Sequence, residues 1–356
     1  NKGWELNAYT SKFARVGKFS MKLRGNIAQN FNEVEEMDPL ILEALNGAET
    51  YQPGNLSYNN RVQIGNALGS IYGLRYKGVY RYDYDHNGYT TASISSYGYA
   101  EVNNTGYDAQ GNPINTAAAA QRRHENFTCP IAYDADGNML TDAKGIPLPM
   151  YYCYNESYRK QFQGGDAIYE DVNHDGQIDR YDMVYLGNSN PKCNGGFGFT
   201  LFYGRFSLNT GFNFRMGNKI INLARANYES MRSNTNQSYA TTWRWRKNGD
   251  ETVIPRALTN VNGYESYNSL PSDRYVENGN YLRLQYVQLR YEFNPQKLKK
   301  YGIRQLTLSA SANNVWCWSK YTGVDPDVSP QGFSVSTDNS RTPRTKSFTC
   351  SANLSF

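Results

Sequence analysis

The last ten residues of the chain alternate strictly between two kinds of side chain. Apolar or small residues occupy every second position, and serine, threonine or asparagine occupies each position between them. Such alternation places the two sets on opposite faces of an extended strand. A transmembrane β-strand needs about 9–11 residues with its apolar side toward lipid, but an edge strand of a soluble sandwich alternates in the same way. The apolar set is Phe348, Cys350, Ala352, Leu354 and Phe356.

Composition excludes several classes of protein. Only 39% of the 356 residues are hydrophobic, and no window approaches the roughly 18 consecutive apolar residues of a membrane helix. A membrane barrel is not excluded, because its strands carry apolar side chains only at alternate positions. The 31 tyrosines suit aromatic girdles at a lipid surface or loops that bind sugars or peptides. The net charge of +5 is small and the basic residues are scattered, so we expect no nucleic-acid partner.

Polar residues within a second alternating segment favour the barrel over the sandwich. Between residues 19 and 31, Lys22, Arg24 and Asn26 share one face. Cations and amides side by side would be costly in the dry core of a sandwich, but they suit the wall of a wide, water-filled lumen. Similar alternation predicts nine strands. They cover residues 3–13, 19–31, 61–68, 71–82, 196–203, 205–216, 281–293, 305–318 and 347–356.

The connections between these strands alternate between short and long. An outer-membrane barrel places short turns at the periplasmic end and long loops at the extracellular end, whereas a sandwich has no such asymmetry. The sequence therefore predicts an all-β protein, an antiparallel transmembrane β-barrel with its C-terminus in the periplasm. Nine is an odd number, so we expect the carboxyl-terminal portion of a larger barrel. The long loops are predicted at residues 32–58, 83–194, 217–275 and 319–344, with short helices at 39–45 and 219–231.

Two further details of the strands are expected. The alternation changes phase inside residues 281–293, because Leu284 and Tyr286 share one face while Val287 and Leu289 share the other. This predicts either a β-bulge or a strand that leaves the membrane and changes its surroundings. The terminal Phe356 is expected to act as a signal for barrel assembly.

One segment of the 83–194 loop matches a calcium-binding pattern. Residues 171–182 follow D-x-[DN]-x-[DN]-G, which supplies hard oxygen ligands around a sharp turn at glycine. Position 12 is aspartate where an EF-hand has glutamate, and no flanking helices are evident. The alternative is an ion-free series of Asx turns. The predicted Ca²⁺ ligands are Asp171, Asn173, Asp175, Gln177, Asp179 and Asp182; Asp83–Gly88 is a weaker match that we interpret as a turn.

The sequence offers no clear catalytic or zinc site. The five cysteines show no C-x-x-C spacing, and no loop gathers a nucleophile, a base and an orienting group, so an enzyme is the least supported class. Cys129 and Cys153 either pair in an oxidising compartment or remain separate thiols. Two similar stretches, Tyr107–Asn112 and Tyr133–Asn138, are predicted to be hairpin turns.

Several blocks together resemble the SusC/RagA family of TonB-dependent outer-membrane transporters. The resemblance covers about the last third of such a transporter, and its TonB box, plug domain and early barrel strands are absent from this sequence. The blocks fall in the family's order and spread over most of the chain. They are residues 1–6, 165–179, 186–192, 195–197, 279–291, 311–316 and 321–326.

This resemblance implies a function and partners. It implies TonB-driven import of oligosaccharides or peptides across the outer membrane of Bacteroidetes-type bacteria, under a SusD-like surface lipoprotein. It also implies a barrel of about 22 strands around a plug, so the partners include the remaining part of the barrel, the TonB complex through the plug, and outer-membrane lipid. Loop aromatics would stack on cargo or pack the loops together. They include Tyr151, Tyr152, Tyr154, Trp243 and Trp245.

Two other functions remain open at this point. The chain could be a structural or assembly component of a barrel without transport of its own. It could also be a soluble, calcium-dependent carbohydrate-binding β-sandwich, which would not need a membrane.

Overall fold

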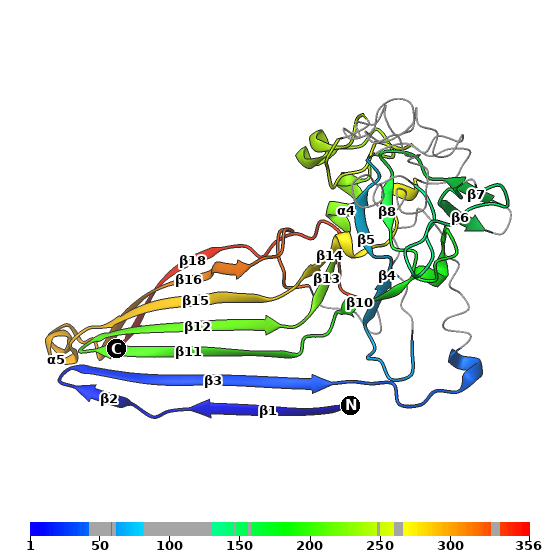
Figure 1. The fold of residues 1–356 in the computed structure, drawn as a ribbon. Coiled ribbons are helices and arrows are strands. Elements are labelled where there is room, and N and C mark those ends of the chain that lie inside the picture. Colours follow the sequence, from blue (N-terminus) through cyan, green and yellow to red (C-terminus); the bar gives the residue numbers. More distant parts are fainter. Residues whose placement is uncertain are drawn as a thin grey trace, which may run out of the picture.

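The protein consists of one long antiparallel sheet and a body of loops that gathers at one end of it (Figure 1). The computed structural model describes residues 1–42, 58, 62–81, 130–145, 147–155, 158–247, 250–259, 266–328 and 335–356. Within these ranges, no helix has the length and apolarity to cross a membrane.

The long sheet is built from consecutive antiparallel neighbours. Its strands are β1 (Lys2–Tyr9), β2 (Phe13–Val16), β3 (Phe19–Phe31), β11 (Cys193–Tyr203), β12 (Phe206–Met216), β15 (Tyr281–Glu292), β16 (Gln305–Ser319) and β18 (Ser347–Ser355). The order is β1-β3-β11-β12-β15-β16-β18, and β2 pairs with β3 beyond the end of β1. Each strand thus lies next to its predecessor in the sheet, as in an up-and-down barrel wall.

The short connections lie at one end of the sheet and the long ones at the other (Figure 1). Gly17 (φ +57°) turns the chain from β2 to β3, and Gly204 (φ +59°) turns it from β11 to β12. Both positions need the left-handed conformation that glycine adopts without steric cost. The third short connection contains the helical turns α5 (Pro295–Leu298) and η5 (Lys299–Tyr301). Three of the four predicted cycles of a short and a long connection are therefore confirmed, and the fourth predicted short turn, at residues 69–70, is not in this sheet.

Two of the nine predicted strands are not in this sheet. Residues 62–68 form no strand. The predicted strand 71–82 is two short strands, β4 (Ser70–Gly73) and β5 (Tyr76–Val79). Both lie in the loop body, where β4 pairs with β10 and β5 pairs with β8. Ile71 and Tyr72 point to opposite faces of β4 and are both buried. A strand buried on both faces belongs between packed layers, so the prediction of a lipid-facing strand here was wrong.

The predicted bulge in β15 is confirmed, but Tyr286, which was expected on the same face as Leu284, lies on the opposite, polar face. Gly211 lies opposite Tyr286, and the next residue, Phe212, lies opposite Leu284, so Gln285 is the extra residue. The pairing of β15 with β16 shifts at the same place. An extra residue exchanges the two faces of a strand. The bulge thereby keeps apolar side chains on one face of the sheet on both sides of Gln285.

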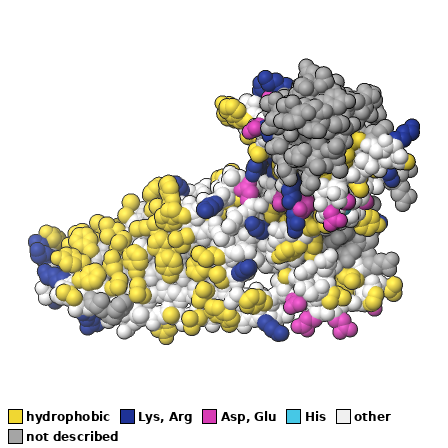
Figure 2. All heavy atoms as spheres, in the orientation of Figure 1, with side chains coloured by type: hydrophobic (Ala, Val, Ile, Leu, Met, Phe, Trp, Pro, Cys, Tyr) yellow, Lys and Arg dark blue, Asp and Glu magenta, His cyan; other side chains and the backbone are white. Residues whose placement is uncertain are grey.

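One face of the sheet is apolar and uncovered. Figure 2 shows hydrophobic side chains spread across it. Leu6 is 60% exposed at one edge strand and Phe348 is 81% exposed at the other. Trp316 and Trp318, at the loop-body end of β16, are also exposed, where an interfacial girdle was expected. A soluble sandwich would cover this face with a second sheet, and the residues that the structure describes form none over it, which favours the barrel.

The loop body has several small sheets and a core of its own. Its other strands are β6 (Tyr151–Asn155), β7 (Tyr158–Gln161), β8 (Ala167–Tyr169), β9 (Gln177–Ile178), β10 (Val184–Asn188), β13 (Lys219–Asn222), β14 (Val276–Asn278) and β17 (Thr337–Asp338). Its helical segments are η1 (Arg180–Asp182), α4 (Leu223–Glu229), η2 (Tyr239–Trp243), η3 (Tyr267–Ser269) and η4 (Asp273–Tyr275). The main core includes Leu74, Tyr152, Phe162, Ile178 and Leu270.

The two predicted loop helices are confirmed only in part. The helix expected at 219–231 is shorter, because its first four residues form β13, which pairs with β14 and β17. Residues 39–42 are helical, and the rest of the helix expected at 39–45 lies outside the described residues.

Candidate functional site

The face of the sheet opposite the apolar one is polar, and the strand register shows how its side chains line up. One row across five strands contains Asn7, Asn26, Gly196, Asn213 and Arg283. Residues directly opposite each other in neighbouring strands point to the same face. The amides and cations that the sequence placed on a water-filled wall therefore do form one continuous surface.

A cavity of about 840 Å³ lies along this polar face. Its volume falls within the range of roughly 300–1,000 Å³ that small-molecule sites occupy. Three arginines and one aspartate supply the charges of its lining, and asparagines and tyrosines supply most of the other polar groups. The polar and charged lining residues used below are Asn7, Arg24, Asn26, Arg215, Tyr286, Asp327 and Arg344.

Two glycines keep part of the cavity floor open. A Cβ atom on Gly211 would lie 2.4 Å from the ring of Tyr286, and one on Gly198 would lie 3.1 Å from Nε of Arg24. Without these Cβ atoms, the Tyr286 ring and the Arg24 side chain lie flat across the strands. The Arg24 guanidinium is 5.6 Å from the centre of the Tyr286 ring, which is within cation–π range.

Residues 320–328, which we call the strap, cross the polar face beside this cavity. Asp327 of the strap lies between two arginines, 3.4 Å from Arg215 and 2.5 Å from Arg344. Arg215 also donates to the carbonyl oxygen of Val328 (3.0 Å). The Asp327 carboxylate is nearly buried and Arg215 is largely buried, so their ion pair is less screened by water than a surface pair, whereas Arg344 is half exposed.

A second aspartate holds the strap to β15. Asp325 forms an ion pair with Arg283, and it also accepts a hydrogen bond from the backbone amide of Asp327 (2.9 Å). Burial alone would raise the pKa of the Asp325 carboxyl, but that amide and the Arg283 guanidinium hold the pKa below its usual value. The carboxylate is therefore ionised at neutral pH.

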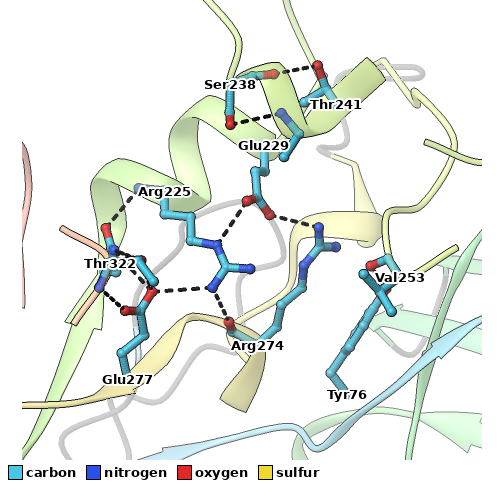
Figure 3. A network of polar contacts seen from close by, with 11 residues as sticks. Tyr76, Arg225, Glu229, Ser238, Thr241, Val253, Arg274, Glu277 and Thr322 are labelled. Carbon is cyan, nitrogen blue, oxygen red and sulfur yellow. Dashed lines mark hydrogen bonds and ion pairs between the residues drawn. The ribbon is translucent and has the colours of Figure 1, made fainter. Parts of the chain in front are cut away.

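The strap is also tied to the loop body. The Thr322 hydroxyl donates to Glu277 (2.6 Å), and Glu277 pairs with Arg225 of α4 (3.2 Å). Figure 3 shows that Arg225 and Arg274 then share the carboxylate of Glu229, at 2.9 and 2.8 Å. The carboxylates neutralise the half-buried Arg225 and the buried Arg274 guanidinium, which offsets part of the cost of burying charge. A continuous polar network thus joins the strap to the interior of the loop body.

A second buried network joins three loops through Asp166. The Asp166 carboxylate is fully buried and pairs with Arg256 (2.7 Å). It also accepts hydrogen bonds from Asn268 (3.0 Å) and from the Tyr267 hydroxyl (3.0 Å). Burial and the neighbouring Asp166 charge raise the pKa of Tyr267, so its hydroxyl keeps the proton that it donates. The network holds these loops together, so that they pack as one body rather than as separate loops.

The structure shows the predicted calcium loop as a series of Asx turns. The carboxylates accept from nearby backbone amides: Asp171 from Gly176 (2.8 Å), and Asp182 from both Val172 (2.8 Å) and Asp179 (2.8 Å). Within the described ranges, no group of three or more His, Cys, Asp or Glu side chains is placed to hold a metal ion. The six predicted ligands, Asp171, Asn173, Asp175, Gln177, Asp179 and Asp182, lie in this one loop.

The loop carries more negative charge than its own hydrogen bonds compensate. Burial is the main cause that raises the pKa of Asp182, to about 7, and the nearby Asp171 and Asp179 raise it further. Burial also raises the pKa of Asp171 and of Asp179. At neutral pH these raised values oppose folding, because ionisation is more costly in the folded loop than in the unfolded chain. The hard oxygen groups suit Ca²⁺ chemically.

The loop aromatics divide between packing and exposure. Tyr152 is buried in the main core, and the Trp245 ring lies against Gly165, where a Cβ would approach it to 2.2 Å. Trp243 is 67% exposed and Tyr151 is half-buried. The side chain of Tyr154 lies outside the described residues. Tyr152 and Trp245 therefore pack the loops together, and Trp243 is open to contact with another molecule.

Of the remaining predicted features, one turn is confirmed. Tyr133 and Met139 pair as an antiparallel bridge around the turn at residues 134–138. The second predicted turn at 107–112, the weaker acidic turn at 83–88 and Cys129 lie outside the described residues, so the Cys129–Cys153 pairing stays a prediction. Phe356 follows β18 and is 71% exposed.

Sequence reasoning missed the two aspartates of the strap. It placed the loop at 319–344 without assigning a role to Asp325 or Asp327. The available signal was a pair of acidic residues in a loop that follows strands with inward-facing arginines, including Arg215 and Arg283. Opposite charges on a wall and on the loop above it predict contact, but alternation alone does not tell which loop folds inward.

Two curated relatives of this chain are much longer than it is. TonB-dependent receptor P39 of Formosa agariphila is 29% identical over 370 residues, which cover 100% of this chain and 30% of that protein. TonB-dependent receptor P26 of the same organism is 31% identical over 168 residues, covering 47% of this chain and 17% of that protein. No family model matches the chain.

Solved structures share the fold. A chain in the structure of the RagAB peptide transporter superposes on 99% of this chain with a TM-score of 0.58, at 16% identity, and this covers 29% of that chain. The RagAB peptide importer in its 'open-open' state gives a TM-score of 0.52 at 15% identity, covering 99% of this chain and 28% of that one. The present chain thus spans about 30% of the length of these proteins.

Proposed function

We propose that this chain is part of a TonB-dependent receptor and forms a portion of the barrel wall of an outer-membrane transporter that imports oligosaccharides or peptides. The observation that carries this proposal is the two-faced sheet. Its apolar face is exposed across all strands, and its opposite face carries a polar cavity of about 840 Å³. A wall of this kind separates lipid from a water-filled path.

The orientation and partners belong to the same proposal. The short turns would face the periplasm together with the C-terminus, and the loop body would lie outside the cell. A SusD-like surface lipoprotein would cover the loop body, and the TonB complex would act through a plug contributed by the rest of the protein. In support, the fold is shared with a chain of the RagAB transporter, and the loop body is held together by the networks around Asp166 and Glu229.

Transport is tested by removing the receptor from cells. Deletion of the complete gene should abolish growth on at least one oligosaccharide or peptide source, and collapse of the proton motive force should stop uptake in cells that retain it. If no nutrient in a broad panel depends on the receptor while it remains inserted in the outer membrane, a structural or assembly role would replace transport.

We also propose that the loop at 171–182 binds a structural Ca²⁺ ion. The acidic pattern and the raised pKa of Asp182 support it, since a cation would remove the cost of keeping that carboxylate ionised. Calcium should protect this loop of the intact receptor from proteolysis, and Asp171→Ala with Asp175→Ala should remove the protection. Equal protection with calcium and with a chelator would mean that the Asx turns hold this loop without a bound ion.

Phe356 is proposed as an assembly signal on the basis of its terminal, exposed position after β18. Deleting Phe356 should lower the amount of receptor in the outer membrane. Normal surface levels would contradict this role.

A further inference from the structure

The charge of the cavity on the polar face indicates what kind of cargo it accepts. Its lining contains three guanidiniums, from Arg24, Arg215 and Arg344, and one carboxylate, from Asp327. Two of the arginines already share that carboxylate. No carboxylate among the described residues pairs with Arg24, so the cavity has excess positive charge at its Arg24 side.

The protein itself shows that this wall binds carboxylates. Asp327 reaches the wall from the strap and lies between Arg215 and Arg344 at ion-pair distance, with only 7% of its side chain exposed. Guanidinium groups hold carboxylates in a fixed, forked geometry and remain charged at all accessible pH values. The contact of Asp327 with these arginines is therefore an example, within the protein, of the contact that a carboxylate of the cargo would make.

Arg24 is positioned for a ligand. The Tyr286 ring lies 5.6 Å from its guanidinium and restricts the conformations of the side chain, and Gly198 leaves the space that the arginine crosses. A guanidinium held in place before binding loses less side-chain entropy when it binds. Arg24 is exposed to the cavity rather than covered by protein.

The neighbouring amides complement an oligomer rather than a simple ion. Asn7 and Asn26 lie opposite each other beside Arg24 and also line the cavity; the Asn7 NH₂ group donates to Glu5 (3.0 Å), which leaves its side-chain oxygen to accept. The Asn26 side-chain oxygen accepts from the backbone amide of Gly196 (3.0 Å), which leaves its NH₂ group to donate. Amides of this kind bind sugar hydroxyls or peptide groups next to a charged substituent.

We propose that this cavity selects short carboxylated oligomers, with Arg24 as the residue that binds the carboxylate. The shared chemistry belongs to two sources, uronic-acid oligosaccharides and acidic peptides. The inference rests on the proposed transport function and specifies its substrate class. It predicts that removing the cargo's charge, while its shape is kept, removes most of the affinity.

The test uses calorimetric titration of the intact, full-length receptor in detergent. The probes are trigalacturonate against its fully methyl-esterified form, and capped tri-aspartate against capped tri-asparagine. At least one carboxylated probe should bind about tenfold more tightly than its uncharged counterpart. The arm that shows the difference identifies the source of the carboxylate.

The residue is tested with a matched pair of variants. Arg24→Gln should lower the affinity for the preferred carboxylated probe by about tenfold and leave the affinity for its uncharged counterpart nearly unchanged. Lys22→Gln is the control, because Lys22 lies two residues away on the same strand and the same face, outside the cavity lining. It removes the same charge and should change affinity by less than about twofold. Heat-dependent gel mobility would confirm that each barrel is folded.

Three results would overturn the inference. They are equal affinity for charged and uncharged probes, no binding of either carboxylated probe, or an equal loss in Arg24→Gln and Lys22→Gln. Import into energised cells is measured separately. A receptor that imports charged and uncharged probes equally would disprove the charge selection and leave transport standing, whereas a receptor that imports nothing would contradict the proposed function itself.

Discussion

The long sheet and the loop body follow opposite rules of burial. In the sheet, large apolar side chains such as Phe348 are exposed and the arginines face inward, whereas in the loop body Phe162 and Ile178 are completely buried. The loop body is stabilised by its own core, as a soluble domain is. The apolar face of the sheet has no cover among the described residues, and under the proposed function lipid would cover it without any loss of backbone hydrogen bonds. One chain thus contains two regions built for two solvents.

The largest expected effect comes from the core of the loop body. Phe162→Ala removes a fully buried ring that packs against Tyr80 and Tyr267, so it should destabilise this body by about 3–5 kcal/mol. Phe348→Ala, on the exposed face of β18, should cost much less in detergent. Limited proteolysis with thermal melting measures both changes. Similar losses for the two variants would mean that the regions do not differ in how they are stabilised.

The second prediction compares the two faces of one strand. Leu289→Arg places a charge on the apolar face of β15, where lipid contact should make it cost about 1–3 kcal/mol, since the cost is largest at the bilayer midplane and falls toward the interfaces. Gln288→Arg, on the neighbouring polar position, should cost less than about 0.5 kcal/mol. Folding into lipid vesicles, titrated with denaturant, measures both. If Gln288→Arg is as damaging as Leu289→Arg, the polar face does not line water.

The sequence predicted the strands of the long sheet well and those of the loop body poorly. Alternation identified the seven strands of the wall, and the phase change predicted a bulge within residues 281–293. It put Tyr286 on the face of Leu284, whereas the extra residue is Gln285 and Tyr286 lies on the polar face. It failed at residues 71–82, where tyrosines alternate with basic residues but both faces of β4 are buried by the loop body. Periodicity reports that a strand has two faces, and it does not report what covers each of them.

The contacts of the candidate site show the same limit. Arg24 and Asn26 were placed on the water-filled wall from their spacing alone, because residues two apart in one strand face the same side of the sheet. The contact of Asp327 with Arg215 joins residues separated by a long loop, and the pairing of Asp166 with Arg256 does the same inside the loop body. No local pattern fixes such contacts, because they depend on how the loops pack.

The smallest predicted effect concerns the joint between the two regions. The Tyr321 hydroxyl donates to the buried carboxylate of Asp338 (2.7 Å), which ties the start of the strap to β17. Tyr321→Phe should cost about 1–2 kcal/mol, because it leaves one buried acceptor short of a partner. Hydrogen exchange should quicken in the strap and in β17 but not in β1. Faster exchange across the whole sheet would mean that the strap stabilises the wall as well.

The central claim, that the sheet separates lipid from water, is tested most directly by spin-label accessibility along β15. Labels are placed one at a time at positions 282–291 of the full receptor in lipid vesicles, and collisions with oxygen and with a water-soluble nickel complex are compared. Labels at 282, 284, 287, 289 and 291 should favour oxygen, and those at 283, 286, 288 and 290 should favour nickel, with the phase reversed at Gln285. An unbroken alternation through residue 285, or access to nickel at every position, would contradict the account.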